Sequence, residues 1–144
     1  DDAPTAAMYI GSGANFVVGP TFNEEVARLC NRRKIPYFPG CATVNEIATA
    51  EEWGVDICKV FPGSTVGGPA FIKAIHGPRP SSLIMPTGGV EVEQSNITEW
   101  FKAGAVCVGL GSNLINKKRL AEGDYEAITR DIQQALTWVK EARS

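Results

Sequence analysis

The sequence lacks the features that mark membrane, secreted and nucleic-acid-binding proteins. Its 144 residues contain no apolar run near the roughly 20 residues that a membrane-spanning helix needs, and no charged segment followed by an apolar one opens the chain as a secretion signal would. The formal charge is only −2, from 14 Lys and Arg against 16 Asp and Glu. Nucleic-acid binding requires a basic surface that neutralises phosphates. We therefore expect a soluble, cytoplasmic protein with neither a membrane nor a nucleic acid as its partner.

Metal and disulfide motifs are also missing. The single histidine, His76, cannot complete a usual zinc site, and no C-x-x-C pair occurs. The four cysteines lie in or beside apolar segments: Cys30, Cys41, Cys58 and Cys107. This setting predicts reduced, partly buried thiols in a reducing compartment and no metal site. Cys58 is the one thiol to watch for reactivity, because it is next to Lys59, while His76 is expected to have a structural role at a helix end.

Short apolar runs alternate with segments of helical periodicity, in a chain that is 44% hydrophobic and 21% charged. The pattern predicts a single domain over residues 1–144. The strands are expected at residues 15–20, 35–40, 56–62, 82–86 and 105–110. The helices are expected at residues 2–10, 24–34, 43–53 and 69–76, around Ile97–Phe101, and from about residue 124 to the end. Strands separated by helices indicate parallel pairing and the α/β class.

Helix-capping residues support three of these helix starts. Asp2 precedes a proline in the first turn, Asn23 precedes the second helix, and Thr43 with Glu46 has the spacing of a capping box. Five parallel strands are compatible with an open, flavodoxin-like sheet or with part of an eight-stranded barrel. No G-x-G-x-x-G motif after an early strand supports a nucleotide- or flavin-binding sheet.

Lys59 is the first candidate for chemistry, because it lies in the middle of a predicted apolar strand. A lysine buried on a parallel strand loses hydration, which lowers its pKa and gives the free amine that forms a Schiff base with a carbonyl compound. The alternative is an edge-strand lysine in solvent, a common means of protecting sheet edges. Sequence alone leaves both interpretations open.

Two glycine-rich segments follow the last two predicted strands, at residues 86–90 (Pro-Thr-Gly-Gly-Val) and 109–113 (Gly-Leu-Gly-Ser-Asn). Glycines let backbone N–H groups approach an anion closely, and many barrels bind phosphate after their last two strands. A single Gly-Gly pair is more often an ordinary turn. Two such turns, one βα unit apart, favour a phosphate site.

Five motifs occur in an order that resembles one family: residues 13–20 (Gly-Ala-Asn-Phe-Val-Val-Gly-Pro), 35–43 (Ile-Pro-Tyr-Phe-Pro-Gly-Cys-Ala-Thr), 59–63 (Lys-Val-Phe-Pro-Gly), 86–90 and 109–114 (Gly-Leu-Gly-Ser-Asn-Leu). The chain resembles the 2-keto-3-deoxy-6-phosphogluconate (KDPG) and 4-hydroxy-2-oxoglutarate (KHG) aldolases. The resemblance implies a (β/α)₈ TIM barrel, of which this chain has about five units. It also implies a class I aldolase that releases pyruvate from a phosphorylated sugar acid or from KHG, without metal or cofactor, in a homo-oligomer, typically a trimer.

The resemblance also implies roles for individual residues. Lys59 is the Schiff-base lysine, with Phe61 packed beside it and Pro20 lining the pocket. The phosphate or distal end of the substrate is held by two groups of residues from the glycine-rich turns: Thr87, Gly88, Gly89, Gly111 and Ser112.

The chain departs from the family pattern in its first part. Family members extend further at the N-terminus, and their acid/base glutamate and carboxylate-binding arginine have no counterpart here. We therefore expect an N-terminally incomplete aldolase sequence. The alternative is a non-catalytic phosphate-binding or assembly fragment of such a barrel.

Overall fold

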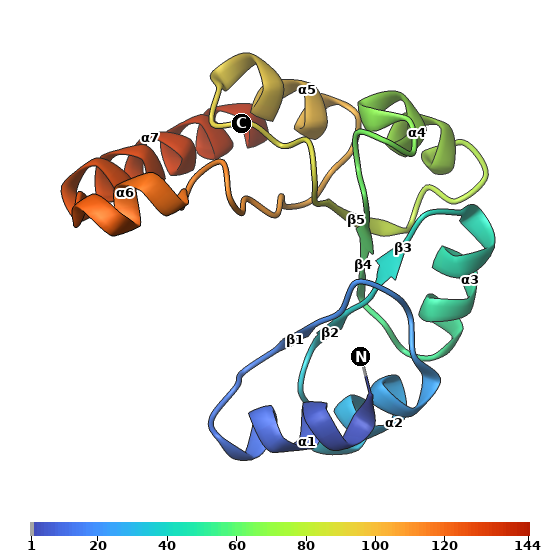
Figure 1. Cartoon of the computed structure of the whole chain (residues 1–144). Helices are drawn as coiled ribbons and strands as arrows, with labels where there is room; N and C mark the ends of the chain where they lie inside the picture. Colours follow the sequence, from blue (N-terminus) through green and yellow to red (C-terminus); the bar gives the residue numbers. More distant parts are fainter. Residues whose placement is uncertain (1) are drawn as a thin grey trace.

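The computed structural model describes residues 2–144 as an α/β arc of short parallel strands and surrounding helices (Figure 1). The strands form the inner side of the arc, and the helices lie toward its outside. The helices are α1 (Ala3–Gly11), α2 (Glu24–Arg33), α3 (Val44–Glu52), α4 (Gly68–His76), α5 (Gln94–Lys102), α6 (Lys117–Glu122) and α7 (Tyr125–Arg143). The strands are β1 (Val17–Val18), β2 (Tyr37–Phe38), β3 (Gly40–Cys41), β4 (Ile57–Val60) and β5 (Leu83–Pro86).

The strands pair in the order in which they occur in the chain. β1 pairs with β2, and β3 pairs with β4, which pairs with β5; every pair is parallel. Only Pro39 separates β2 from β3, and a proline has no N–H to donate to a sheet. A flavodoxin-like sheet needs a point at which the strand order reverses. Among residues 2–144 there is no such reversal, so the flavodoxin-like alternative is wrong.

Two expectations for the strands need correction. The predicted strand at residues 35–40 is divided at Pro39 into β2 and β3. The predicted strand at 105–110 is not a regular strand, because it bonds to β5 at only a few points: the N–H groups of Val106 and Gly109 donate to the carbonyls of Ile84 and Pro86, and a single bridge joins residues 87 and 109. Helix α6 was not predicted at all.

The predicted helix caps are confirmed. The side chains of Asp2 and Asn23 accept hydrogen bonds from backbone N–H groups in the first turns of α1 and α2. Thr43 and Glu46 form the reciprocal capping box of α3. Backbone N–H groups that donate to the Glu46 carboxylate, that of Ala42 above all, hold its pKa below the usual value.

The core lies between the outer face of the strands and the helices. Cys58 and Val60 of β4 and Ile84 of β5 are fully buried, against side chains such as Ile47 of α3 and Trp100 of α5. All four cysteines are free thiols, three of them buried and Cys107 partly so, which confirms the expectation of unpaired thiols. No helix among residues 2–144 has the length and apolar character to cross a membrane.

Gly40 allows the loop after β1 to touch β3. A Cβ atom built on Gly40 would lie 1.8 Å from the carbonyl oxygen of Pro20, so only glycine fits without moving that loop. The hydroxyl of Tyr37 also holds the loop: it donates to the carbonyl of Thr21 and accepts from the N–H of Asn23. The position of Pro20 is therefore fixed by β2 and β3.

The Gly40→Ala variant is expected to lower the free energy of unfolding by about 1–3 kcal/mol, the usual cost of forcing extra volume into a packed site. Urea denaturation would measure this loss. Gly11→Ala is the matched control, because a Cβ at Gly11 meets nothing within 4 Å; it should change stability by less than about 0.5 kcal/mol. Equal effects of the two substitutions would contradict the assigned contact.

Candidate active site

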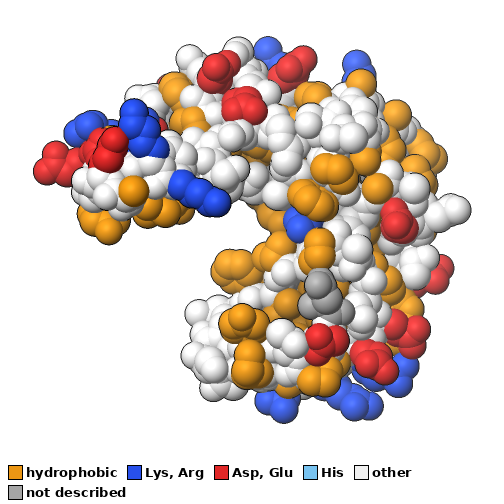
Figure 2. All heavy atoms as spheres, in the orientation of Figure 1, with side chains coloured by type: hydrophobic (Ala, Val, Ile, Leu, Met, Phe, Trp, Pro, Cys, Tyr) orange, Lys and Arg blue, Asp and Glu red, His pale blue; other side chains and the backbone are white. Residues whose placement is uncertain are grey.

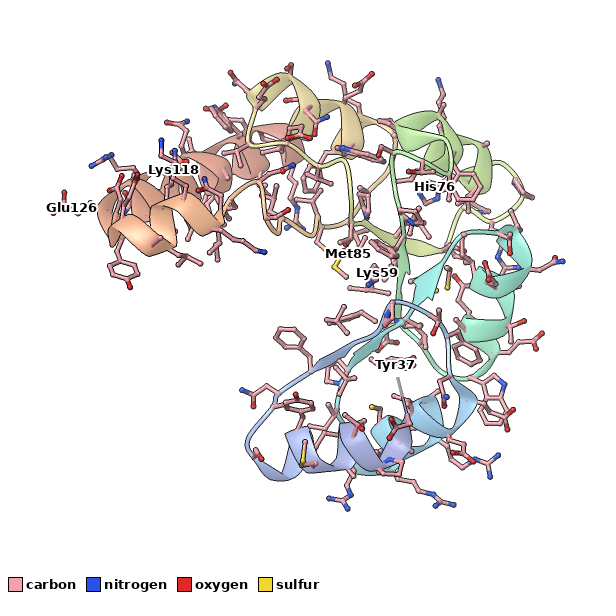
Figure 3. All side chains as sticks on the ribbon, viewed as in Figure 1. Tyr37, Lys59, His76, Met85, Lys118 and Glu126 are labelled. Carbon is pink, nitrogen blue, oxygen red and sulfur yellow. The ribbon has the colours of Figure 1, made fainter. Side chains whose placement is uncertain are left out.

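Lys59 lies at the centre of the inner side of the arc. β4 is flanked by β3 and β5, and Lys59 is in register with Gly40 on one side and Met85 on the other. Figure 3 shows Lys59 and Met85 next to each other, directed into the hollow of the arc. Lys59 is only 6% exposed. The interpretation of Lys59 as an edge-strand residue in solvent is therefore wrong.

The surroundings of the Lys59 amine are apolar. Its Nζ lies 4.7 Å from the centre of the Phe61 ring, and among residues 2–144 no carboxylate forms an ion pair with it. Loss of hydration on burial lowers the pKa of Lys59, while the nearby thiol of Cys41 acts more weakly in the opposite direction. A larger fraction of neutral amine is thus present near neutral pH than for an exposed lysine. A neutral amine can attack a carbonyl carbon.

Cys58, the thiol beside Lys59 in the sequence, points to the other side of the sheet and is fully buried. Its hydrogen bond with Cys41 and its burial raise its pKa, which keeps it protonated and unreactive. His76 is likewise structural: its Nε2 is 3.2 Å from the carbonyl oxygen of Gly104, on a neighbouring loop and not on its own helix. In Figure 3 it lies on α4, away from Lys59.

The two glycine-rich turns lie side by side. The bridge between Thr87 and Gly109 aligns them, and the Asn113 amide donates to the carbonyl of Val90 at 3.3 Å and to the carboxylate of Glu91 at 2.7 Å. Positive φ angles of 85° and 82° at Gly88 and Gly89 favour glycine there. The structure therefore brings together the two turns that the sequence singled out.

These turns contain unused hydrogen-bond donors. Among the described residues, the backbone N–H groups of Gly89, Gly111 and Ser112 have no acceptor, and the buried hydroxyl of Thr87 has no partner. The loop that follows Phe61 reaches the same place, because the N–H groups of residues 63 and 64 donate to the carbonyls of residues 87 and 88. Free N–H groups in glycine-rich turns are able to bind an anion.

Sequence reasoning missed the two residues that flank Lys59, Gly40 and Met85. Their positions within the predicted strands were visible, but their register with Lys59 was not.

Residues 2–144 contain no group of three or more His, Cys, Asp or Glu side chains that could hold a metal ion. A cavity of about 400 Å³ between α2 and the start of β2 is lined by Cys30, Asn31 and Tyr37, among others. Lys59 is not among its lining residues.

The midpoint for deprotonation of Lys59 is expected below 10.5, the value of an unperturbed lysine. Burial penalises the charged form, so the amine loses its proton earlier as the pH rises. An NMR titration of isotope-labelled lysine would give the midpoint, with Lys59→Met used to assign the signal. A midpoint at or above 10.5 would show that burial does not control this amine.

Fold and site together define a class: a parallel α/β protein with a buried lysine on the central strand of its three-stranded sheet and glycine-rich turns with free N–H groups after the strands that follow. A family model described as KDPG and KHG aldolase matches residues 2–131. The chain belongs to this family.

Three similar proteins illustrate the relationship. The 2-dehydro-3-deoxy-phosphogluconate aldolase of Treponema pallidum is 34% identical over 125 residues, which cover 87% of this chain and 59% of that protein. The 2-dehydro-3-deoxy-6-phosphogalactonate aldolase of Escherichia coli is 36% identical over 132 residues, 91% of this chain and 60% of that protein. The KDPG aldolase of Legionella pneumophila, with pyruvate captured as a covalent carbinolamine, superposes with a TM-score of 0.78 at 26% identity, over 88% of this chain and 62% of that one. This chain thus spans about three-fifths of the length of the curated relatives.

Proposed function

We propose that this chain forms the imine-forming and phosphate-binding part of a class I aldolase that cleaves KDPG, KHG or both. The observation that carries the proposal is the desolvated amine of Lys59, 6% exposed on the central strand. The Legionella pneumophila relative, which holds pyruvate as a covalent carbinolamine, supports the same chemistry. Pyruvate is the common product, with glyceraldehyde 3-phosphate or glyoxylate as the second product.

In the proposed reaction the neutral amine of Lys59 attacks the keto carbon of the substrate. Protonation of the carbinolamine hydroxyl and loss of water give a protonated imine. The hydroxyl group on the far side of the bond to be broken then gives up its proton and becomes the aldehyde carbonyl, while the electron pair of the carbon–carbon bond moves into the imine and forms an enamine. The enamine takes up a proton and is hydrolysed to pyruvate and free lysine. The ring of Phe61, 4.7 Å from Nζ, faces the cationic imine favourably. The loop of Pro20 lines the pocket on the side of Gly40.

The distal end of the substrate is assigned to the glycine-rich turns. In this proposal the free N–H groups of Gly89, Gly111 and Ser112 donate to the phosphate, while Thr87 supplies its unpartnered hydroxyl and Gly88 gives the turn its shape. No acid/base residue of this chain is assigned, because no described carboxylate pairs with Lys59.

The five strands are proposed to be part of an eight-stranded TIM barrel. Consecutive strand order and helices on the outside of the arc support this. The whole protein is proposed to be a cytoplasmic homo-oligomer, a trimer by resemblance to its family. Free thiols fit a reducing compartment, and the exposed apolar side chains of Met8 and Tyr9 on α1 offer contact surface.

Reduction with borohydride in the presence of pyruvate tests the imine. We expect a stable covalent adduct on Lys59, located by peptide mass spectrometry, and no adduct in the Lys59→Met variant, which keeps the side-chain volume but removes the amine. Lys73→Met, on the exposed face of α4, is the matched control and should be labelled like the wild type. Absence of an adduct in folded wild-type protein would favour the alternative, a non-catalytic phosphate-binding or assembly fragment.

Ser112→Asp tests the phosphate assignment. A carboxylate in the anion site should raise the KDPG concentration for half-maximal borohydride trapping about tenfold, which corresponds to about 1.4 kcal/mol of repulsion. Trapping with pyruvate, which has no distal anionic group, should change little. Ser81→Asp places the same charge before β5, at the opposite end of the strand, and should leave both compounds unaffected. Equal effects on KDPG and pyruvate would contradict the assignment.

A further inference from the structure

A side chain joins the two glycine-rich turns beyond the backbone bridge described above. The Nδ2 amide of Asn113 donates to the carbonyl of Val90 at 3.3 Å and to the carboxylate of Glu91 at 2.7 Å. Among the described residues, no backbone hydrogen bond connects residues 88–91 with residues 110–113, and no ion pair engages Glu91. The contact between these parts of the turns therefore depends on Asn113.

The Asn113 side chain bonds next to the free donors of the proposed anion site. Val90 directly follows Gly89, and Asn113 directly follows Ser112. The N–H groups of Gly89 and Ser112 are the ones that have no acceptor among the described residues. The hydrogen bond between Asn113 and Val90 thus constrains the separation of these two donors, with one residue intervening on each side.

Glycine gives both turns many alternative backbone conformations in the absence of such a contact. Residues 86–90 contain two glycines, and residues 109–113 contain another two. Glycine loses more conformational freedom on ordering than any other residue. If the turns were not joined, binding of an anion would have to supply the free energy of ordering them. A hydrogen bond formed before the anion arrives removes part of that cost.

Glu91 is itself held from the other side. Its N–H donates to the side-chain oxygen of Asn96 at 2.9 Å, in the first turn of α5. A chain of hydrogen bonds therefore runs from α5 through Glu91 to Asn113. It attaches the second glycine-rich turn to a helix.

We propose that Asn113 and Glu91 are positioning residues of the anion site: their hydrogen bond holds the N–H groups of the two turns at the separation that a phosphate group requires. This inference rests on the function proposed above and adds to it the contact that favours a phosphorylated substrate.

The charge of Glu91 has to be separated from its role in positioning. Loss of the Asn113 amide also frees the Glu91 carboxylate, whose charge repels phosphate. Figure 2 shows further acidic side chains over α5, the helix that follows Glu91. Glu91→Gln separates the two effects, because its side-chain oxygen still accepts from Asn113 but carries no charge. Asn113→Ala is therefore made in the wild type and in the Glu91→Gln background.

The test uses two readouts on the whole chain. One is NMR titration of the backbone amides of Gly89 and Ser112 with inorganic phosphate, and the other is borohydride trapping with KDPG and with pyruvate. Asn113→Ala should weaken phosphate binding about fivefold in both backgrounds, which corresponds to about 1 kcal/mol for one hydrogen bond. It should raise the half-maximal KDPG concentration by a similar factor relative to pyruvate. A general loss of structure would instead affect both compounds.

Asn31 provides the matched control. Its amide donates to the carbonyl of Trp53 at 2.7 Å, so it also joins two successive βα units through an exposed asparagine side chain. It lies in the last turn of α2, before β2 begins, at the opposite end of the strands from the glycine-rich turns. Asn31→Ala should leave phosphate binding within about twofold of the wild type.

The outcomes separate the two proposals. If the amides respond to phosphate but pyruvate gives no adduct, the imine chemistry is wrong, and the effect of Asn113→Ala on phosphate binding still decides the role of the pair. If phosphate binding is the same in wild type and Asn113→Ala, only the positioning role is overturned. An effect that disappears in the Glu91→Gln background assigns it to charge and overturns that role too.

Two further results have defined meanings. If phosphate does not shift the amides of the wild type, the anion site is wrong and the role of the pair is wrong with it. Circular dichroism checks folding of the variants. Should Asn113→Ala not fold, Asn113→Leu, which has a similar size but no donor, decides by the same ratio.

Discussion

Burial of one amine on a central parallel strand constrains the residues around the site. The strand must place Lys59 on the inner face while its alternate residues, Cys58 and Val60, are fully buried under the helices. Because no described carboxylate stabilises the charged form of the amine, its small or apolar neighbours favour the neutral form. Gly40, Phe61 and the β5 residue in register are these neighbours.

The contact between Gly40 and Pro20 connects the first part of the chain to this site. An extra methyl group on β3 would collide with the Pro20 carbonyl, and the hydroxyl of Tyr37 holds the same loop by two hydrogen bonds. Similar short contacts join the loops after β4 and β5, where the N–H of Gly63 donates to the carbonyl of Thr87 at 2.8 Å. Loops from successive βα units are therefore fixed to each other near the ends of the strands, beside Lys59 and the glycine-rich turns.

Features that depend on residues close together in the sequence were predicted. Features that depend on pairing between distant segments were not. Helix caps at Asp2, Asn23 and Thr43 depend on residues within one turn, so the sequence revealed them. Lys59 stood out because a charged residue interrupts an apolar strand. Two features depend on which neighbouring strand offers hydrogen bonds: the split of one predicted strand at Pro39 and the loose pairing of residues 105–110. Such pairing cannot be seen in a single sequence. For the same reason, the residues in register with Lys59, Gly40 and Met85, were missed.

The cause of the low pKa of Lys59 links reactivity to specificity. If a neighbouring cation lowered the pKa of Lys59, that pKa could be changed by substituting the cation, without altering the proposed substrate pocket. Here loss of hydration is the main cause, and the side chains that exclude water from Nζ are those that the proposed keto-acid substrate would contact. Enlarging the pocket admits water to the amine and restores part of its hydration, which moves its pKa back toward 10.5. A wider substrate range should therefore be accompanied by a smaller fraction of neutral amine at neutral pH, because one apolar surface determines both.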